Sequence, residues 1–298
     1  MRVLTKDMMH NKPIQPTKNN LRNLKSKGLL YSNPFLLPYI RHLTMQLNYK
    51  TFGTGFPLII LHGLLGSLDN WQAIAKQLSS QFQVYIIDQR NHGRSPHSYD
   101  FTYQLLVNDI LNFMQQQGIA QAHFIGHSMG GKVVMNLALQ HPSKVAKLIV
   151  VDVAPVEYED RHNHVFKGLF AVHLQALTSR DMAAEILRNY LGEESTVQFL
   201  MKGLYRDEQN QFQWRFNVQT LYDAYQEIST GIAPQQPFEG PTLFIKGQVS
   251  NYINAANFSE IIDLFPHNQL VEIEGAGHWV HADNAAKFTE VVEQFLMP

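Results

Sequence analysis

The stretch FIGHSMGGK, residues 124–132, decides the fold. It continues a short apolar run with β-character at 122–125, and the segment 132–140 that follows has apolar residues at helical spacing. Gly126-x-Ser128-x-Gly130 therefore lies at a sharp turn from strand to helix, where strained backbone needs neighbours without Cβ. Such a turn exposes the Ser128 hydroxyl and directs free N–H groups of the helix toward whatever it attacks. A Gly-rich turn without chemistry is the alternative.

Length and composition limit the class of protein. A chain of 298 residues suits one α/β domain with an insertion. There is no cysteine, which excludes disulfides, thiolate zinc sites and a cysteine nucleophile. No apolar run approaches the ~20 residues of a membrane-spanning helix. The net charge of −1 argues against nucleic acid as the main partner, and the histidines show no metal-ligand spacing, so we expect no metal and no cofactor.

Residues 1–44 form a basic extension that is rich in Asn, Lys and Pro, whereas the rest of the chain is acidic. A secretory signal needs an apolar segment of ~7–15 residues, which this extension lacks. It could be a disordered tail, a mitochondrial transit peptide or residues upstream of a true start at Met45. We favour the third interpretation because a folded pattern begins directly after Met45. We expect a cytoplasmic protein, or a mitochondrial one if the extension is a transit peptide.

Buried strand patterns alternate with helical ones along most of the chain, which predicts a parallel sheet with right-handed crossovers. We expect strands at 46–52, 57–61, 82–88, 122–125, 145–153, 242–247 and 270–273, and helices at 69–79, 102–117, 132–140, 255–265 and from 283. Residues 156–238 give mostly helical patterns, at 164–177, 181–191, 196–205 and 217–228, and no buried-strand run. We predict an α/β core of residues 45–155 and 239–298, with a mostly parallel sheet flanked by helices, and a helical cap at 156–238. The cap would cover the carboxyl edge of the sheet, where open α/β sheets bind ligands.

A serine hydroxyl needs a base that accepts its proton, and in this architecture the chain order is nucleophile, acid, histidine. His278 follows the last expected strand, and Gly275 and Gly277 let that loop bring an imidazole back over the sheet. Most of the fourteen histidines must be surface or packing residues. His281 lies near the start of the next helix, and His127 is expected to shape the turn. His278 is therefore the predicted base.

The acid is less obvious. The commonest arrangement has it after the strand that follows the cap, at 247–253, but no carboxylate stands there. Asp152 ends the strand before the cap, and from there it could hold the needed tautomer of His278. In the alternative, Asp152 only caps its loop and the acid lies elsewhere, at Asp263 or Asp283. Ser250, in the vacated loop, could donate a hydrogen bond to Asp152 or His278, or be an ordinary loop serine.

The oxyanion of a tetrahedral intermediate needs two donors. The N–H of Met129, next after the nucleophile, is one, and the N–H of Leu64 in the loop after the first parallel strand is the other. Losing one such donor typically costs ~3–4 kcal/mol of barrier. Candidate substrate contacts are His62, Trp214, Phe216 and Tyr252. Aromatic residues of a helical cap more often pack its helices together.

At this point the chain resembles the α/β-hydrolase superfamily, and more narrowly the YbfF-type bacterial esterases and their mitochondrial abhydrolase relatives. The motifs that carry the resemblance lie at residues 62–70 (HGLLGSLDN), 90–95 (RNHGRS), 124–132, 152–156 (DVAPV), 214–217 (WRFN), 250–253 (SNYI) and 275–281 (GAGHWVH). The resemblance runs from Met45 to about Phe295. It implies a carboxylesterase with an acid after the pre-cap strand and a supporting serine, in agreement with Asp152 and Ser250. It also implies possible acyl-CoA thioesterase activity.

The function we predict is hydrolysis of short- to medium-chain acyl esters, and of acyl-CoA thioesters, through an acyl-enzyme. Ser128 attacks, His278 relays the proton and Asp152 orients His278. The expected partner is a small-molecule ester or acyl-CoA, and we expect no binding to nucleic acid or membranes. We expect the protein to be a monomer or a homodimer. The alternatives are a C–C bond hydrolase or other α/β-hydrolase chemistry on a small molecule, and a hydrolase fold kept only as a binding module.

Overall fold

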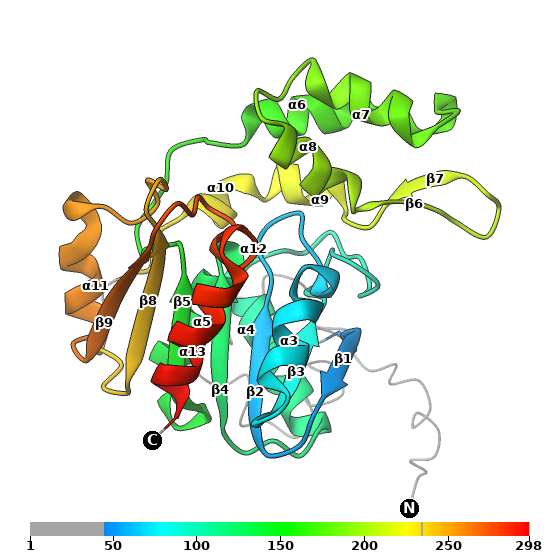
Figure 1. The fold of residues 1–298 in the computed structure, drawn as a ribbon. Coiled ribbons are helices and arrows are strands. Elements are labelled where there is room, and N and C mark those ends of the chain that lie inside the picture. The colour runs from blue at the N-terminus through cyan, green and yellow to red at the C-terminus, as the bar shows by residue number, and fades with distance from the viewer. Residues whose placement is uncertain (1–44, 234, 298) are drawn as a thin grey trace, which may run out of the picture. The chain divides into compact units, whose positions relative to one another are not determined.

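The computed structural model describes residues 45–233 and 235–297 (Figure 1). The three interpretations of residues 1–44 lie outside these residues. A seven-stranded sheet in the order β1-β3-β2-β4-β5-β8-β9 forms the centre. Only β1 runs antiparallel to its neighbour in this sheet. The strands are β1 (Tyr49–Phe52), β2 (Phe56–Leu61), β3 (Phe82–Ile87), β4 (Ala122–His127), β5 (Val145–Val151), β8 (Thr242–Gly247) and β9 (Asn268–Ile273).

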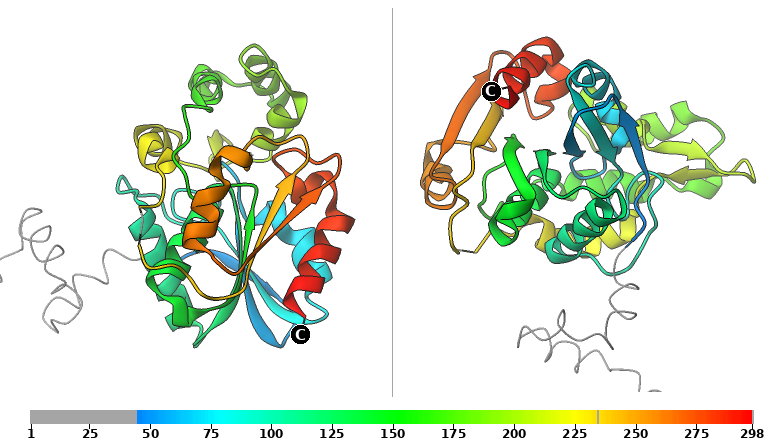
Figure 2. Two further views of the ribbon diagram at one scale, coloured as in Figure 1. Left: turned by 90° about the vertical axis from the view of Figure 1, so that its left-hand side faces the viewer. Right: turned by 90° about the horizontal axis from the view of Figure 1, so that it is seen from below.

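Helices cover both faces of the sheet (Figure 2). One face packs against α3, α12 and α13, and the other against α4, α5 and α11. These helices are α3 (Gln72–Leu78), α4 (Tyr103–Gln116), α5 (Met129–Gln140), α11 (Phe258–Leu264), α12 (Val280–Asp283) and α13 (Ala285–Leu296). The predicted mostly parallel sheet with flanking helices is confirmed.

The continuous apolar runs of the central strands follow from this two-sided burial. In β2, Leu58 and Ile60 pack on the side of α13, while Ile59 and Leu61 pack on the side of α5. Successive side chains of a strand point to opposite faces, so a strand covered on both faces needs an apolar residue at every position. All four side chains are at most 1% exposed.

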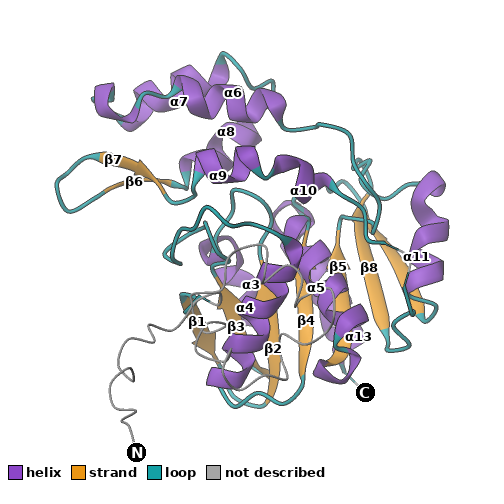
Figure 3. Ribbon diagram, turned by 180° about the vertical axis from the view of Figure 1, so that it is seen from behind, coloured by secondary structure: helices purple, strands orange, loops and turns teal. Residues whose placement is uncertain are grey.

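The chain between β5 and β8 leaves the sheet and passes over the carboxyl ends of the strands (Figures 1 and 3). We call residues 156–238 the inserted segment. Its elements are α6 (Asn163–Ala171), α7 (Arg180–Arg188), α8 (Glu194–Met201), β6 (Leu204–Arg206), β7 (Phe212–Trp214), α9 (Val218–Asp223) and α10 (Tyr225–Ser229). No helix in the described part of the chain is both long and apolar enough to cross a membrane.

The prediction of an inserted segment without strands is wrong in one place. The helix expected at 196–205 ends at Met201, and β6 and β7 form an antiparallel hairpin. The turn between them determines this structure. Asp207 accepts hydrogen bonds from the N–H groups of Gln209 and Gln211, and Asn210 has a φ of 61°. Asp and Asn favour such turns because their short side chains bond to nearby backbone.

Candidate active site

Ser128 stands on strained backbone between β4 and α5. Its φ is 53° and its ψ −119°, and its N–H donates to the carbonyl of Val151 on the neighbouring strand at 3.0 Å. The two glycines of the motif permit the close approach of α5 to the sheet. A Cβ at Gly126 would lie 2.3 Å from the carbonyl oxygen of Gly130, and one at Gly130 would lie 2.5 Å from that of His62. The turn therefore has the geometry that the motif predicts.

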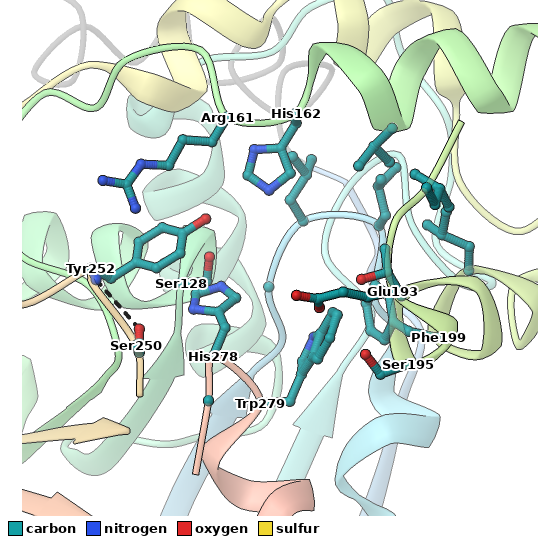
Figure 4. A pocket seen from close by; sticks show the side chains of 18 of the residues that line it. Ser128, Arg161, His162, Glu193, Ser195, Phe199, Ser250, Tyr252, His278 and Trp279 are labelled. Atoms are coloured by element: carbon teal, nitrogen blue, oxygen red, sulfur yellow. Dashed lines mark hydrogen bonds between the residues drawn. The ribbon is translucent and has the colours of Figure 1, made fainter. Parts of the chain in front are cut away.

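Asp152 and His278 are brought together from strands that lie far apart in the sequence. Nδ1 of His278 lies 2.7 Å from Oδ2 of Asp152, whose side chain is fully buried. With its Nδ1 proton donated to this carboxylate, the ring presents Nε2 as an acceptor. Ser128 and His278 line the same cavity, which Figure 4 shows from close by.

Two further donors fix the carboxylate of Asp152. The N–H of Gly247 donates to Oδ1 at 3.1 Å, and the Ser250 hydroxyl donates to Oδ2. Three hydrogen bonds to the two carboxyl oxygens hold the group in a single orientation. The alternative acids have other surroundings: Asp283 accepts the N–H of Gly277 at 2.8 Å, and Asp263 is exposed on α11.

The loop after β2 presents a free backbone donor to the cavity. The Gly66 N–H donates to the carbonyl of Gly63 at 3.1 Å, which closes a tight turn around Leu64 and Leu65. The N–H of Leu65 donates to Nε2 of His92. In residues 45–233 and 235–297, no acceptor bonds the N–H of Leu64. Met129 begins α5, where the first N–H groups have no partner within the helix. Both donors border the space beside Ser128.

His62, predicted to contact substrate, lies beneath this loop and does not line the cavity. Its ring is 1% exposed, Nε2 accepts the N–H of Gln89 at 3.0 Å, and Nδ1 donates to the carbonyl of Gly63 at 2.8 Å. Burial lowers the pKa of His62 to about 4, and burial lowers that of the neighbouring His92 to about 3. Both rings are therefore neutral at pH 7. Each donates through one nitrogen and accepts through the other, which fixes the turn that carries Leu64.

The main cavity has a volume of about 870 Å³. The loops after the strands form one wall, and residues of α6, α8 and the α7–α8 connection form the other. Trp214 and Phe216, predicted to contact substrate, do not line this cavity. Their rings are buried and stack on each other at 5.2 Å, and Phe216 contacts Gly203 after α8. Phe199 and Trp279, whose rings are 5.1 Å apart, are the aromatic residues that line the wall instead.

Tyr252 does line the cavity, and it also supports His278. The two rings stack at 4.0 Å with an angle of 16° between their planes. The Arg161 guanidinium lies 4.7 Å from the centre of the Tyr252 ring, and Figure 4 shows Tyr252 between Arg161 and His278. Burial raises the pKa of Tyr252 to about 12, so its hydroxyl is protonated at neutral pH. Arg161 was not predicted, because no sequence pattern marks a loop residue that reaches back to the site.

The described residues contain no group of three or more His, Asp or Glu side chains that could hold a metal ion. The arrangement instead provides a strained serine, an oriented imidazole, a buried carboxylate and two backbone donors. Together these groups can perform nucleophilic acyl transfer without a metal.

Comparison with known proteins agrees with the fold. A family model described as alpha/beta hydrolase fold matches residues 57–285. The esterase YbfF of Escherichia coli is 37% identical over 241 residues, which are 80% of this chain and 92% of that protein. The sn-1-specific diacylglycerol lipase ABHD11 of Danio rerio is 37% identical over 85% of this chain and 83% of its own.

A solved structure of a marine microorganism esterase superimposes with a TM-score of 0.83 at 38% identity, covering 85% of this chain and all of that one. The E-2-(acetamidomethylene)succinate hydrolase structure has a TM-score of 0.72 at 18% identity, which shows the shared fold alone. The chain therefore belongs, with these esterases and lipases, to the α/β-hydrolase fold family.

Proposed function

We propose that the protein is a serine esterase that hydrolyses carboxylic esters of small molecules through an acyl-enzyme. Ser128 is the nucleophile, His278 the general base and acid, and Asp152 the orienting carboxylate. One observation carries this proposal. The ring of His278 is held by Asp152 at 2.7 Å while it lines the same cavity as the strained Ser128. The names of the esterase and lipase relatives agree with it.

The reaction follows from the positions of these groups. Oγ of Ser128 bonds to the acyl carbon as its proton passes to Nε2 of His278. The N–H groups of Leu64 and Met129 stabilise the negative oxygen. His278 then gives the proton to the leaving alcohol or thiol as its bond to the acyl carbon breaks. A water molecule repeats the sequence, with His278 accepting its proton and returning one to Ser128, and the acid leaves.

The substrate class that we propose is short- to medium-chain acyl esters, with acyl-CoA thioesters as a second group. A thioester needs the same attack and the same two donors, and its thiolate leaves more easily than an alkoxide. We also propose that the inserted segment is a cap that selects substrates, because Val165 of α6 and Phe199 of α8 line the cavity opposite Ser128 and His278.

The test is Ser128→Ala with p-nitrophenyl butyrate as substrate and an organophosphonate as covalent label. We expect kcat to fall by ~10⁴–10⁶ and labelling to disappear. Ser259→Ala, which changes an exposed serine on α11, should leave both unchanged. Labelling that persists in Ser128→Ala would place the nucleophile at another residue.

A further inference from the structure

Ser128 lies between two spaces of very different size. The main cavity of about 870 Å³ is bordered by His278 but not by Met129. A second space, which we call the inner chamber, has a volume of about 30 Å³ and is bordered by Met129 but not by His278. Leu64 and Ser128 border both. The acyl chain and the leaving group of a substrate bonded to Ser128 can therefore each extend either into the main cavity or into the inner chamber.

The requirements of the reaction decide which part of the substrate lies in which space. The carbonyl oxygen must face the N–H groups of Leu64 and Met129, and the leaving group must lie where Nε2 of His278 can protonate it. Because His278 borders only the main cavity, the leaving alcohol or thiol occupies that cavity. The acyl chain, on the remaining bond of the tetrahedral carbon, then extends toward the inner chamber.

We propose that the inner chamber is the acyl subsite and that the enzyme takes acyl groups of two or three carbons, carried on large alcohols or thiols. This inference rests on the proposed esterase function and narrows its substrate class. A cavity needs ~10–15 Å³ to hold one water molecule, so 30 Å³ accommodates about two non-hydrogen atoms. Acetyl and propionyl groups have one and two carbon atoms beyond the carbonyl carbon and fit within this limit, whereas octanoyl has seven and does not.

Hydrogen bonds prevent one wall of the inner chamber from moving outward. Lys132 is 2% exposed, and its Nζ donates to the carbonyl of Ser229 at 2.9 Å and to that of Thr230. The hydroxyl of Tyr103 donates to the carbonyl of Ile228 at 2.8 Å. A displacement of the end of α10 would leave the buried amino group of Lys132 without its acceptors, which is costly.

Tyr158, whose ring lies 5.0 Å from Nζ of Lys132, is fixed in a similar way. The Tyr158 hydroxyl donates to the carbonyl of Tyr252 at 2.7 Å and accepts the N–H of Ala154 at 2.8 Å. This one side chain thus joins the loop after β5 to the loop after β8. These bonds to backbone hold Lys132, Tyr103 and Tyr158 in place around the inner chamber and oppose its expansion.

The first test uses the wild-type protein and p-nitrophenyl esters with a constant leaving group: acetate, propionate, butyrate, hexanoate and octanoate. We expect kcat/KM for acetate to exceed that for octanoate at least tenfold. Equal or higher kcat/KM for octanoate would overturn the acyl subsite while leaving the esterase proposal in place. Absence of hydrolysis of every ester would overturn both proposals.

The second test enlarges the inner chamber. Ile228→Ala removes three carbon atoms from its wall, while the backbone carbonyl that bonds Tyr103 remains. We expect the butyrate-to-acetate ratio of kcat/KM to rise at least tenfold. The matched variant Val165→Ala enlarges only the main cavity and should change that ratio less than twofold. A shift of the ratio by Val165→Ala and not by Ile228→Ala would place the acyl chain in the main cavity and overturn the inference.

Discussion

Asparagine at position 152 tests the proposed relay with a change of one functional group. The Asp152 carboxylate is fully buried and accepts hydrogen bonds from the Gly247 N–H, the Ser250 hydroxyl and Nδ1 of His278. Asparagine keeps the volume but has one acceptor oxygen, which the Gly247 N–H can retain. Its NH₂ group would then replace Oδ2, the oxygen that faces His278.

The size of the effect follows from the tautomer. An NH₂ group opposite Nδ1 favours a ring with its proton on Nε2, and such a ring cannot accept the proton of Ser128. In the serine proteases the wrong histidine tautomer lowers kcat ~10⁴-fold, which corresponds to an increase of ~5 kcal/mol in the activation barrier. Because Asp152 does not border the cavity, we expect KM for p-nitrophenyl acetate to change less than about threefold.

The comparison variant is Asp283→Asn, which removes a carboxylate from the same region. Asp283 bonds the N–H of Gly277 and does not contact the ring, so this variant should keep at least a tenth of kcat. Thermal unfolding of both variants shows whether either loss reflects misfolding. A folded Asp152→Asn variant that keeps more than a tenth of wild-type kcat would refute this reasoning. A ~10⁴-fold loss of kcat in Asp283→Asn instead would assign the orienting role to Asp283.

Two further predictions concern the surroundings of these groups. Tyr252→Leu removes the ring that stacks on His278. Because such ring pairs are worth ~0.5–1.5 kcal/mol, we expect kcat to fall two- to tenfold, whereas Tyr252→Phe should stay near the wild-type kcat. Equal kcat for the Leu and Phe variants would contradict a stacking role. His62, His92 and His281 are buried, and burial lowers their pKa values to about 4, 3 and 3. In the unfolded chain these histidines have a pKa of ~6.5, so below that pH they bind protons that the folded chain does not bind. Their contribution to the free energy of unfolding is therefore complete above pH ~6.5 and is lost as the pH falls toward 4. The loss reaches ~2 kcal/mol per ring at pH 5. Urea unfolding at pH 7.5 and pH 5 measures this loss, and identical midpoints would show that the rings are not buried in their neutral form.

The sheet and the main groups of the site could be predicted because each depends on local pattern. Two-sided burial leaves continuous apolar runs, and a strand-to-helix turn with a serine needs Gly126 and Gly130. The choice of Asp152 came from the absence of a carboxylate at 247–253, together with the rule that strand ends meet at one edge. The structure places Asp152 against His278 and Ser250, although their catalytic roles await the variants above.

The walls of the cavity could not be predicted, because they depend on tertiary contacts. Trp214 and Phe216 were chosen for their aromatic rings, but sequence does not show whether a ring faces a ligand or another ring. His62 precedes the donor loop directly, yet its side chain turns inward to bond Gln89 and Gly63. The β6–β7 hairpin was missed because strands of three residues are too short to show a period of two.

The placement of strain explains why the proposed nucleophile and the proposed acid, Ser128 and Asp152, follow central strands. Ser128 and Asp152 have φ values of 53° and 51°, a conformation that costs non-glycine residues ~1–3 kcal/mol each. Each is the first residue after its strand, and its N–H still donates to the next strand, to Val151 and Ile245 respectively. Such strain persists only where surrounding structure over-determines it.

β4 and β5 have hydrogen-bonded strands on both sides, so they can impose this conformation on the residue that follows. β9 is an edge strand, and the loop after it places the positive φ on Gly275, which carries no strain, three residues before His278. In the proposed relay His278 accepts and returns a proton while its ring stays aligned with Ser128 and Asp152, so a loop held by side-chain contacts suits it. Ser128 and Asp152 keep fixed positions because the hydrogen-bonded strands on both sides of β4 and β5 hold their strained backbone in place.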